Sequence, residues 1–123
     1  MKPGLAILLV EDEAIIAMDL RFRLISAGCG RCRVVSTGEA AVASAETEPF
    51  DMIVMDNHLA GAMDGIEAAA RIRDFKDIPV IFMTGYPQDE VYLAKTRPLR
   101  PAACLDKPVI FEDLIAAIDS VAS

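Results

Sequence analysis

Five polar residues each follow a short apolar run of the sequence, and their types suit one kind of chemistry. They are Glu11, Asp12, Asp56, Thr84 and Lys107. Gathered carboxylates repel one another unless a cation compensates them, and Mg²⁺ prefers oxygen ligands of this kind. An aspartate can attack phosphorus as a nucleophile, and the oxygens of the transferred group need counter-charge. The set therefore fits phosphoryl transfer onto an aspartate, with the metal, Lys107 and the Thr84 hydroxyl each holding a phosphoryl oxygen.

Apolar runs alternate with segments of helical spacing along the whole chain. The runs cover residues 5–10, 32–36, 52–55, 80–83 and 102–105. Continuous apolar runs are typical of strands buried on both faces, and their alternation with helices indicates βα units around a parallel sheet. Ligands of such sheets bind beyond the carboxyl ends of the strands, which is where the five polar residues fall. We expect an α/β fold with a five-stranded parallel sheet, doubly wound as (βα)5, in a single domain over residues 1–123.

The segments between the runs carry signals for helix ends. The first helix is expected over residues 13–27, with Gly28 directly after its end. Ser36 and Glu39 fit a capping box for the second helix, and Asp64 can cap the third. The fourth helix is expected to be short, over residues 88–95, because prolines follow it, and the last is expected over residues 111–121.

Charge and hydropathy exclude several classes of protein. The formal net charge of −7 argues against binding of nucleic acid or of an anionic membrane through charge alone. The apolar run at residues 5–10 is too short to span a bilayer, and no signal peptide is recognisable. We expect a cytoplasmic protein that binds neither nucleic acid nor membrane directly.

The three cysteines do not form a disulfide framework, because their number is small and odd. Cys29 and Cys32 have the spacing of a redox motif, but a redox pair is expected at a helix N-terminus, where the thiol pKa falls. Here the pair follows a helix and enters a strand, so a redox role is an alternative left open and not the preferred one. A zinc site is less favoured still, because structural zinc takes four ligands and the chain has one histidine.

Five short motifs, in this order, resemble those of the receiver domains of two-component response regulators, in the CheY-like superfamily. They read Leu-Leu-Val-Glu-Asp-Glu at 8–13, Val-Met-Asp-Asn at 54–57, Met-Asp-Gly at 63–65, Met-Thr-Gly at 83–85 and Asp-Lys-Pro at 106–108. The resemblance covers essentially the whole chain. It implies a flavodoxin-like receiver fold and a signalling protein, not an enzyme, whose Asp56 accepts a phosphoryl group from a histidine kinase or histidine phosphotransfer protein.

The resemblance also assigns roles at the site. Asp12 and Asp56 would bind Mg²⁺ directly, Glu11 would act through a metal-bound water, and the backbone carbonyl of His58 would be the third protein ligand. Thr84 and Lys107 would contact the phosphoryl group. A cis peptide is expected before Pro108. A phosphorylation-dependent homodimer is a further partner that the resemblance allows.

Three departures from the family pattern bear on switching. The loop after Asp56 lacks the proline common near Ala60, and Cys104 stands where many receivers have an aromatic switch residue. The sequence Phe-Met-Thr-Gly-Tyr at 82–86 partly matches a receiver subfamily with the signature Phe-Ala-Thr-Gly-x-Tyr. We therefore expect phosphorylation to act through the Thr84 side, the loop 85–89 and the segment 88–100. His58 and Tyr86 would flank the path of the attacking water and shield the phosphoryl group.

A second apolar stripe on the first helix is a candidate docking surface for the kinase. One stripe, with Leu20 and Leu24, suits the core, and the other carries Ile15, Met18 and Phe22. Methionine and phenylalanine are enriched at interface cores, and the resemblance adds Pro108 and Val109 of the loop after the last strand. The alternative is that one or two of these side chains complete the hydrophobic core.

Two rival functions compete with the receiver interpretation. A phosphohydrolase with an aspartyl nucleophile after the first strand needs a second aspartate two residues on, and Ala14 stands at that spacing from Asp12. The other rival is a phosphorylation-independent interaction module of the same fold. The presence of all five polar residues counts against loss of the site.

Overall fold

The five apolar runs form the strands of one parallel sheet in the computed structural model, which describes residues 1–85 and 89–122. The strands are β1 (Ala6–Val10), β2 (Arg31–Val35), β3 (Met52–Asp56), β4 (Val80–Thr84) and β5 (Ala103–Asp106), in the spatial order β2-β1-β3-β4-β5. Each lies within one residue of its predicted bounds. Three of them end one residue later than predicted, so that β3 ends on Asp56, β4 on Thr84 and β5 on Asp106.

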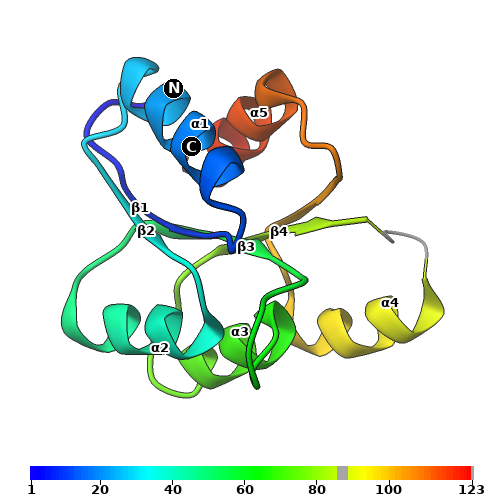
Figure 1. The fold of residues 1–123 in the computed structure, drawn as a ribbon. Helices are drawn as coiled ribbons and strands as arrows, with labels where there is room; N and C mark the ends of the chain where they lie inside the picture. The colour runs from blue at the N-terminus through cyan, green and yellow to red at the C-terminus, as the bar shows by residue number, and fades with distance from the viewer. Residues whose placement is uncertain (86–88, 123) are drawn as a thin grey trace.

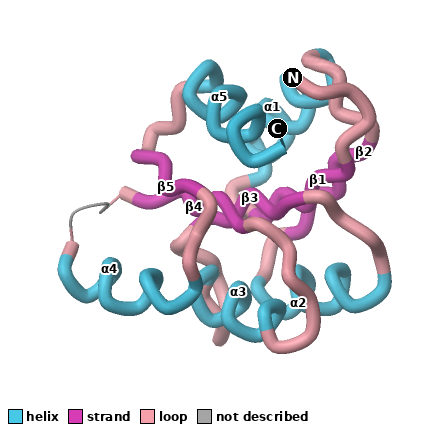
Figure 2. The backbone as a smooth tube through the Cα atoms, turned by 180° about the vertical axis from the view of Figure 1, so that it is seen from behind, coloured by secondary structure: helices cyan, strands magenta, loops and turns pink. Residues whose placement is uncertain are grey.

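The helices cover both faces of the sheet, which confirms the doubly wound prediction. They are α1 (Ala14–Ser26), α2 (Gly38–Thr47), α3 (Gly65–Arg73), α4 (Glu90–Thr96), the 3₁₀ turn η1 (Arg97–Leu99) and α5 (Phe111–Ala122). α1 and α5 lie on one face, and α2, α3 and α4 lie on the other (Figures 1 and 2). The fold is therefore the flavodoxin-like receiver fold.

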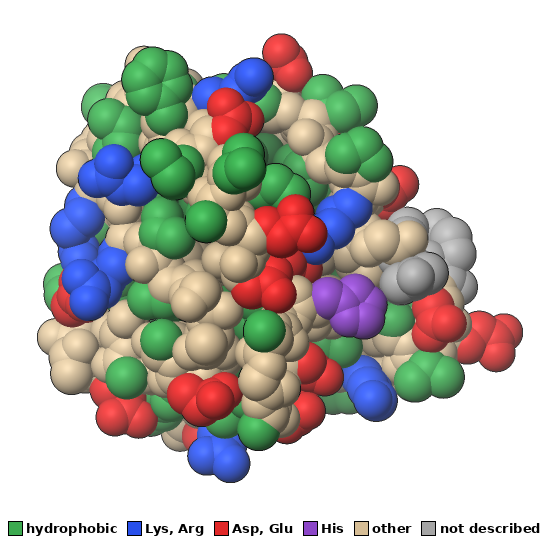
Figure 3. Space-filling view, viewed as in Figure 1, with side chains coloured by type: hydrophobic (Ala, Val, Ile, Leu, Met, Phe, Trp, Pro, Cys, Tyr) green, Lys and Arg blue, Asp and Glu red, His purple; other side chains and the backbone are tan. Residues whose placement is uncertain are grey.

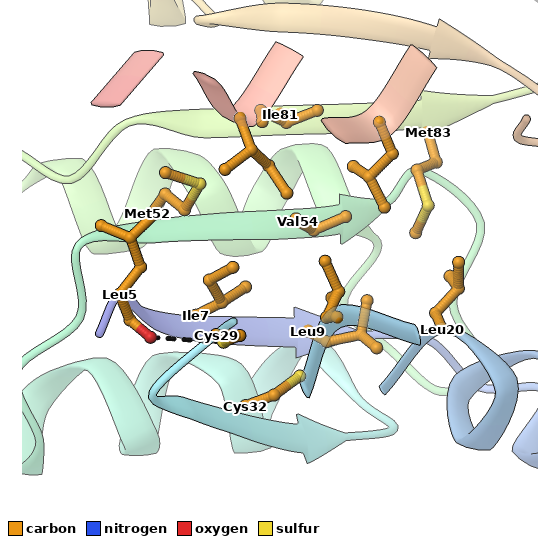
Figure 4. Close-up of a cluster of buried hydrophobic side chains, with 13 residues drawn as sticks. Leu5, Ile7, Leu9, Leu20, Cys29, Cys32, Met52, Val54, Ile81 and Met83 are labelled. Carbon is orange, nitrogen blue, oxygen red and sulfur yellow. Dashed lines mark hydrogen bonds between the residues drawn. The ribbon is translucent and has the colours of Figure 1, made fainter. Parts of the chain in front are cut away.

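The core has two layers because successive strand residues point to opposite faces. Ile7, Leu9 and Val54 pack on the side of α1 and α5 (Figure 4), and Leu8 and Ile53 pack on the side of α2 and α3. β3 and β4 are buried at every residue, so their last residues are held in place by packing on both faces. This rigidity matters for the site, because those last residues are Asp56 and Thr84.

The strand register brings the carboxyl ends of the central strands level with one another. Asp56 lies opposite Met83, and Thr84 lies opposite Asp106. β1 ends beside β3, with Val10 opposite Met55. The residues that follow β1, β3, β4 and β5 therefore meet at one edge of the sheet.

Of three helix-end residues predicted from the sequence, the structure confirms two and corrects one. Gly28, with φ +112°, follows α1, and Asp64 caps α3 by accepting a hydrogen bond from the Glu67 N–H at 2.8 Å. The second cap was predicted wrongly: Thr37, not Ser36, accepts the bond, from the N–H of Ala40 at 3.1 Å. α2 begins at Gly38, which moves Glu39 off the position that a capping box requires.

The cysteine pair lies where the sequence placed it, after α1 and within β2. Cys29 and Cys32 are both buried free thiols, and the Cys29 Sγ donates to the Leu5 carbonyl at 3.2 Å (Figure 4). Burial raises the pKa of the Cys32 thiol to about 11 and also raises that of Cys29. Thiols held in the protonated form are poor nucleophiles, which argues against a redox role. Over the described ranges, no helix is long and apolar enough to cross a membrane.

Candidate functional site

Three carboxylates meet at the carboxyl edge of the sheet. Glu11 and Asp12 follow β1, and Asp56 ends β3. One oxygen from each of the three side chains lies within 4.8 Å of the others. Glu11 and Asp56 are buried and Asp12 is exposed, so the cluster opens to solvent on the Asp12 side.

Asp56 is only 1 % exposed, and two donors hold one of its oxygens. Its Oδ1 accepts a hydrogen bond from Nζ of Lys107 at 2.6 Å and from the backbone N–H of His58 at 3.0 Å. Charge-assisted bonds of this length fix the orientation of a carboxylate. The buried aspartate is thus oriented and paired with a lysine that is itself partly exposed.

Glu11 carries the clearest sign that this cluster is built for an additional cation. Its Oε1 accepts the N–H of Glu13 at 3.2 Å, while Oε2 is buried with no hydrogen-bond partner among the described residues. Burial, and then the neighbouring Asp56, raise the pKa of Glu11 to about 8. A buried carboxyl oxygen without a partner is costly. A divalent cation would supply both the missing partner and the missing charge, so the residues present fit such an ion.

Thr84 and Lys107 reach the site through the register of β4 and β5. Thr84 is fully buried at the end of β4, and its carbonyl accepts the backbone N–H of Lys107 at 2.8 Å. The peptide between Lys107 and Pro108 is cis, as predicted. The structure therefore brings together the carboxylates, the lysine and the threonine that the sequence singled out.

Gly65, the first residue of α3, packs against the backbone of Asp56. A Cβ atom at this position would lie 2.1 Å from the carbonyl oxygen of Asp56. No other side chain fits there without moving the end of β3 or the start of α3. The sequence placed this glycine in a motif but gave no sign of the close approach, because the contact depends on how the helix packs.

The second stripe of α1 lies on the surface and not in the core. Ile15, Met18 and Phe22 are 85 %, 70 % and 71 % exposed, so the alternative that they complete the core is excluded. A cleft of about 440 Å³ separates α1 from the loop after β5, and Ile15, Pro108 and Val109 line it. Pro108 is exposed, and Val109 is half-buried against the core. Figure 3 shows hydrophobic side chains over α1 and α5, next to a group of acidic side chains.

A buried tyrosine on α4 contacts the cysteine that stands in place of an aromatic residue on β5. The Tyr92 hydroxyl lies 3.5 Å from Sγ of the exposed Cys104, and the Tyr92 ring packs edge-on against Phe82, with centroids 6.4 Å apart. The short helix α4, which begins two residues later than predicted, thus has an aromatic anchor that sequence reasoning missed. Tyr86, expected to shield the phosphoryl group, lies outside the described residues, as does part of the predicted switch loop.

Comparison with known proteins agrees with this arrangement. A family model described as the response regulator receiver domain matches residues 7–119. The transcriptional regulatory protein PdtaR of Mycobacterium tuberculosis is 33 % identical over 117 residues, which is 95 % of this chain and 56 % of that protein. The phyllosphere-induced regulator PhyR of Methylorubrum extorquens is 36 % identical over 83 % of this chain and 38 % of its own length. The chain thus spans about half or less of these relatives.

Solved structures are similar over nearly their whole length. The signal receiver domain of a modulated diguanylate cyclase from Desulfovibrio desulfuricans G20 is 34 % identical with a TM-score of 0.86, covering 96 % of this chain and 93 % of that one. The receiver domain of the sensor histidine kinase PA1611 from Pseudomonas aeruginosa PAO1 is 30 % identical with a TM-score of 0.83, covering 98 % and 99 %. That structure has a magnesium ion coordinated in its active site cleft.

Proposed function

The chain belongs to the response regulator receiver domain family, the phospho-acceptor modules of two-component signalling, and we propose that Asp56 is its acceptor. The observation that carries this assignment is the environment of Asp56. It is a buried carboxylate at the end of a central strand, 2.6 Å from Nζ of Lys107 and clustered with Glu11 and Asp12. Among the described residues, no other aspartate combines a lysine partner with a carboxylate cluster.

The cation proposed for this cluster is Mg²⁺. Asp12 and Asp56 would bind it directly together with the backbone carbonyl of His58, and Glu11 would hold it through a bound water. Support comes from the unpartnered oxygen of Glu11 and from the magnesium ion in the similar PA1611 receiver. When bound, the ion balances the charge of the carboxylates and of one phosphoryl oxygen.

The protein side chains then have separate tasks in the transfer. A carboxylate oxygen of Asp56 attacks phosphorus, the new P–O bond forms, and the P–N bond of the donor phosphohistidine breaks with the histidine as leaving group. Lys107 and the His58 N–H hold the carboxylate in position before the attack. Lys107 and the hydroxyl of Thr84 would balance the other two phosphoryl oxygens afterwards.

The phosphoryl donor is proposed to be a histidine kinase or a histidine phosphotransfer protein in the cytoplasm. Its docking surface would comprise the exposed residues Ile15, Met18 and Phe22 of α1, with Pro108 and Val109 across the cleft. Of these, Ile15, Pro108 and Val109 line the same cleft as Glu11 and Lys107 of the site. Exposed apolar side chains at this density are typical of interaction sites.

Incubation with acetyl phosphate and Mg²⁺ tests the proposed function. Intact-mass measurement should give one added phosphoryl group in the wild type and none in Asp56→Asn, which preserves the shape of the side chain. Chelation of the metal should also prevent the gain. A wild type that binds Mg²⁺ but gains no mass would favour the phosphorylation-independent interaction module.

A further inference from the structure

The carboxylate of Asp12 is exposed, yet a distant loop fixes its orientation. Its Oδ2 accepts a hydrogen bond of 3.1 Å from the backbone N–H of Ala60, which is 48 residues away in the sequence. Asp12 lies between β1 and α1, and Ala60 lies between β3 and α3. An exposed aspartate without such a contact would sample several rotamers.

The same loop also holds the acceptor aspartate. The His58 N–H donates to Asp56 Oδ1 at 3.0 Å, and two residues later the Ala60 N–H donates to Asp12. One short stretch of backbone therefore orients both of the carboxylates to which direct metal binding is assigned. Because each bond engages one oxygen, the second oxygen of Asp12 stays available.

Other contacts keep this stretch in place. The Asn57 N–H donates to the Met83 carbonyl at 2.9 Å, and Leu59 packs against the core on the side of α2 and α3. Gly61 follows Ala60 with φ +99°, a conformation that glycine adopts without strain. The Ala60 N–H is thus a donor at a defined position and not a chance contact of a loose loop.

We propose that Ala60 is a positioning residue for the metal site, acting through its backbone N–H on Asp12. The inference rests on the proposed function, since it concerns the cation that the phosphoryl transfer uses. The bond restricts the rotamers of the Asp12 carboxylate before the cation arrives. The ordering cost of binding is then smaller. A proline at position 60 has no N–H and could not do this.

Replacement of Ala60 by proline, with Ala60→Ser as the matched control, tests the role. Serine keeps the N–H, so the Mg²⁺ dissociation constant measured by calorimetry should stay within about twofold of the wild type. In Ala60→Pro, loss of the charge-assisted bond should raise the Mg²⁺ dissociation constant about threefold to tenfold. Acetyl phosphate labelling of Asp56 in this variant should be slow at low Mg²⁺ and recover at saturating Mg²⁺. Equal dissociation constants for the two variants would overturn the proposal.

A second measurement covers the case in which proline disturbs the loop, because proline also restricts the residue before it. In Asp12→Ala, the Ala60 amide should exchange with deuterium several-fold faster than in the wild type, while the His58 amide should not change. If the Ala60 amide exchanges at the same rate in Asp12→Ala as in the wild type, that result alone would overturn the inference. If the wild type binds no Mg²⁺ and is not labelled, the proposed function fails as well. If it binds and is labelled but neither Ala60 result appears, only the inference fails.

Discussion

The amino group of Lys107 lies 2.6 Å from Oδ1 of Asp56, although 51 positions separate the two residues in the sequence. Asp56 is buried, and the Lys107 side chain is 33 % exposed. The pair therefore orients the carboxylate of Asp56, the proposed acceptor, while the amino group of Lys107 can still turn toward an incoming group. Removing one partner of such a pair is costly, because it leaves the other charge buried without compensation.

Lys107→Ala should separate metal binding from the response to phosphorylation. Removal of a cation takes away no oxygen ligand, so the variant should bind Mg²⁺ at least as tightly as the wild type. It should also lose most of the conformational response to beryllofluoride, because one phosphoryl oxygen lacks its partner. Calorimetry and amide exchange measure the two effects. A clear loss of Mg²⁺ affinity would mean that Lys107 helps to form the metal site.

Metal should stabilise the protein more at pH 8 than at pH 6. Burial and Asp56 raise the pKa of Glu11 from 4.5 to about 8, so without a cation the folded state keeps a proton that the unfolded state loses. The contribution of Glu11 to the free energy of unfolding is therefore fully present at low pH and is lost as the pH rises from about 4.5 to about 8. Mg²⁺ should offset that loss. Melting temperatures measured over this pH range, with EDTA or with Mg²⁺, test the prediction. In EDTA, the melting temperature of Glu11→Gln should depend less on pH than that of the wild type. An equal effect of Mg²⁺ at pH 6 and pH 8 would contradict the prediction.

The contact between Tyr92 and Cys104 should transmit the phosphorylation signal to α4. Tyr92→Phe removes only the hydroxyl, with a stability loss of about 1 kcal/mol, and should speed alkylation of Cys104 several-fold. Cys29 and Cys32 are buried, so they should react slowly and not confuse the assay. In the wild type, beryllofluoride should change both Cys104 alkylation and amide exchange over residues 89–100. Exchange changes confined to α1 and α2 would refute this route.

Docking of the kinase should depend on the exposed stripe of α1. Ile15→Ala together with Met18→Ala should slow phosphotransfer from the cognate kinase about tenfold or more, as for central interface residues. Labelling by acetyl phosphate should be unchanged, since neither side chain is buried in the core. Glu46→Ala, at an exposed position of α2 on the other face of the sheet, is a polar control. An equal loss in both assays would mean that the stripe supports the fold instead.

Much of the fold and of the site follows from local patterns in the sequence. Five buried strands give five continuous apolar runs, and the chemistry of a parallel sheet lies where those runs end. Asp56, Thr84 and Lys107 could therefore be predicted before any coordinates. Thr37 could not be chosen over Ser36 as the helix cap, because adjacent residues of similar type both satisfy the pattern.

Contacts that depend on packing between distant segments left no local signal. The Ala60 N–H reaches Asp12 only because two loops meet at the sheet edge, and alanine says nothing about its backbone donor. Tyr92 anchors α4 through Phe82 and Cys104, on two different strands. The glycine at 65 is explained only by the Asp56 carbonyl that it approaches.

Chemical mapping of the phosphorylated residue tests the central claim most directly. Borohydride reduces an aspartyl phosphate to homoserine, so the protein is labelled with acetyl phosphate and Mg²⁺, reduced, digested and sequenced by mass spectrometry. Homoserine should appear at position 56 and at no other aspartate, and it should disappear when Mg²⁺ is chelated. Homoserine at Asp12 or at another aspartate, with Asp56 unchanged, would contradict the assignment of Asp56 as the phospho-acceptor.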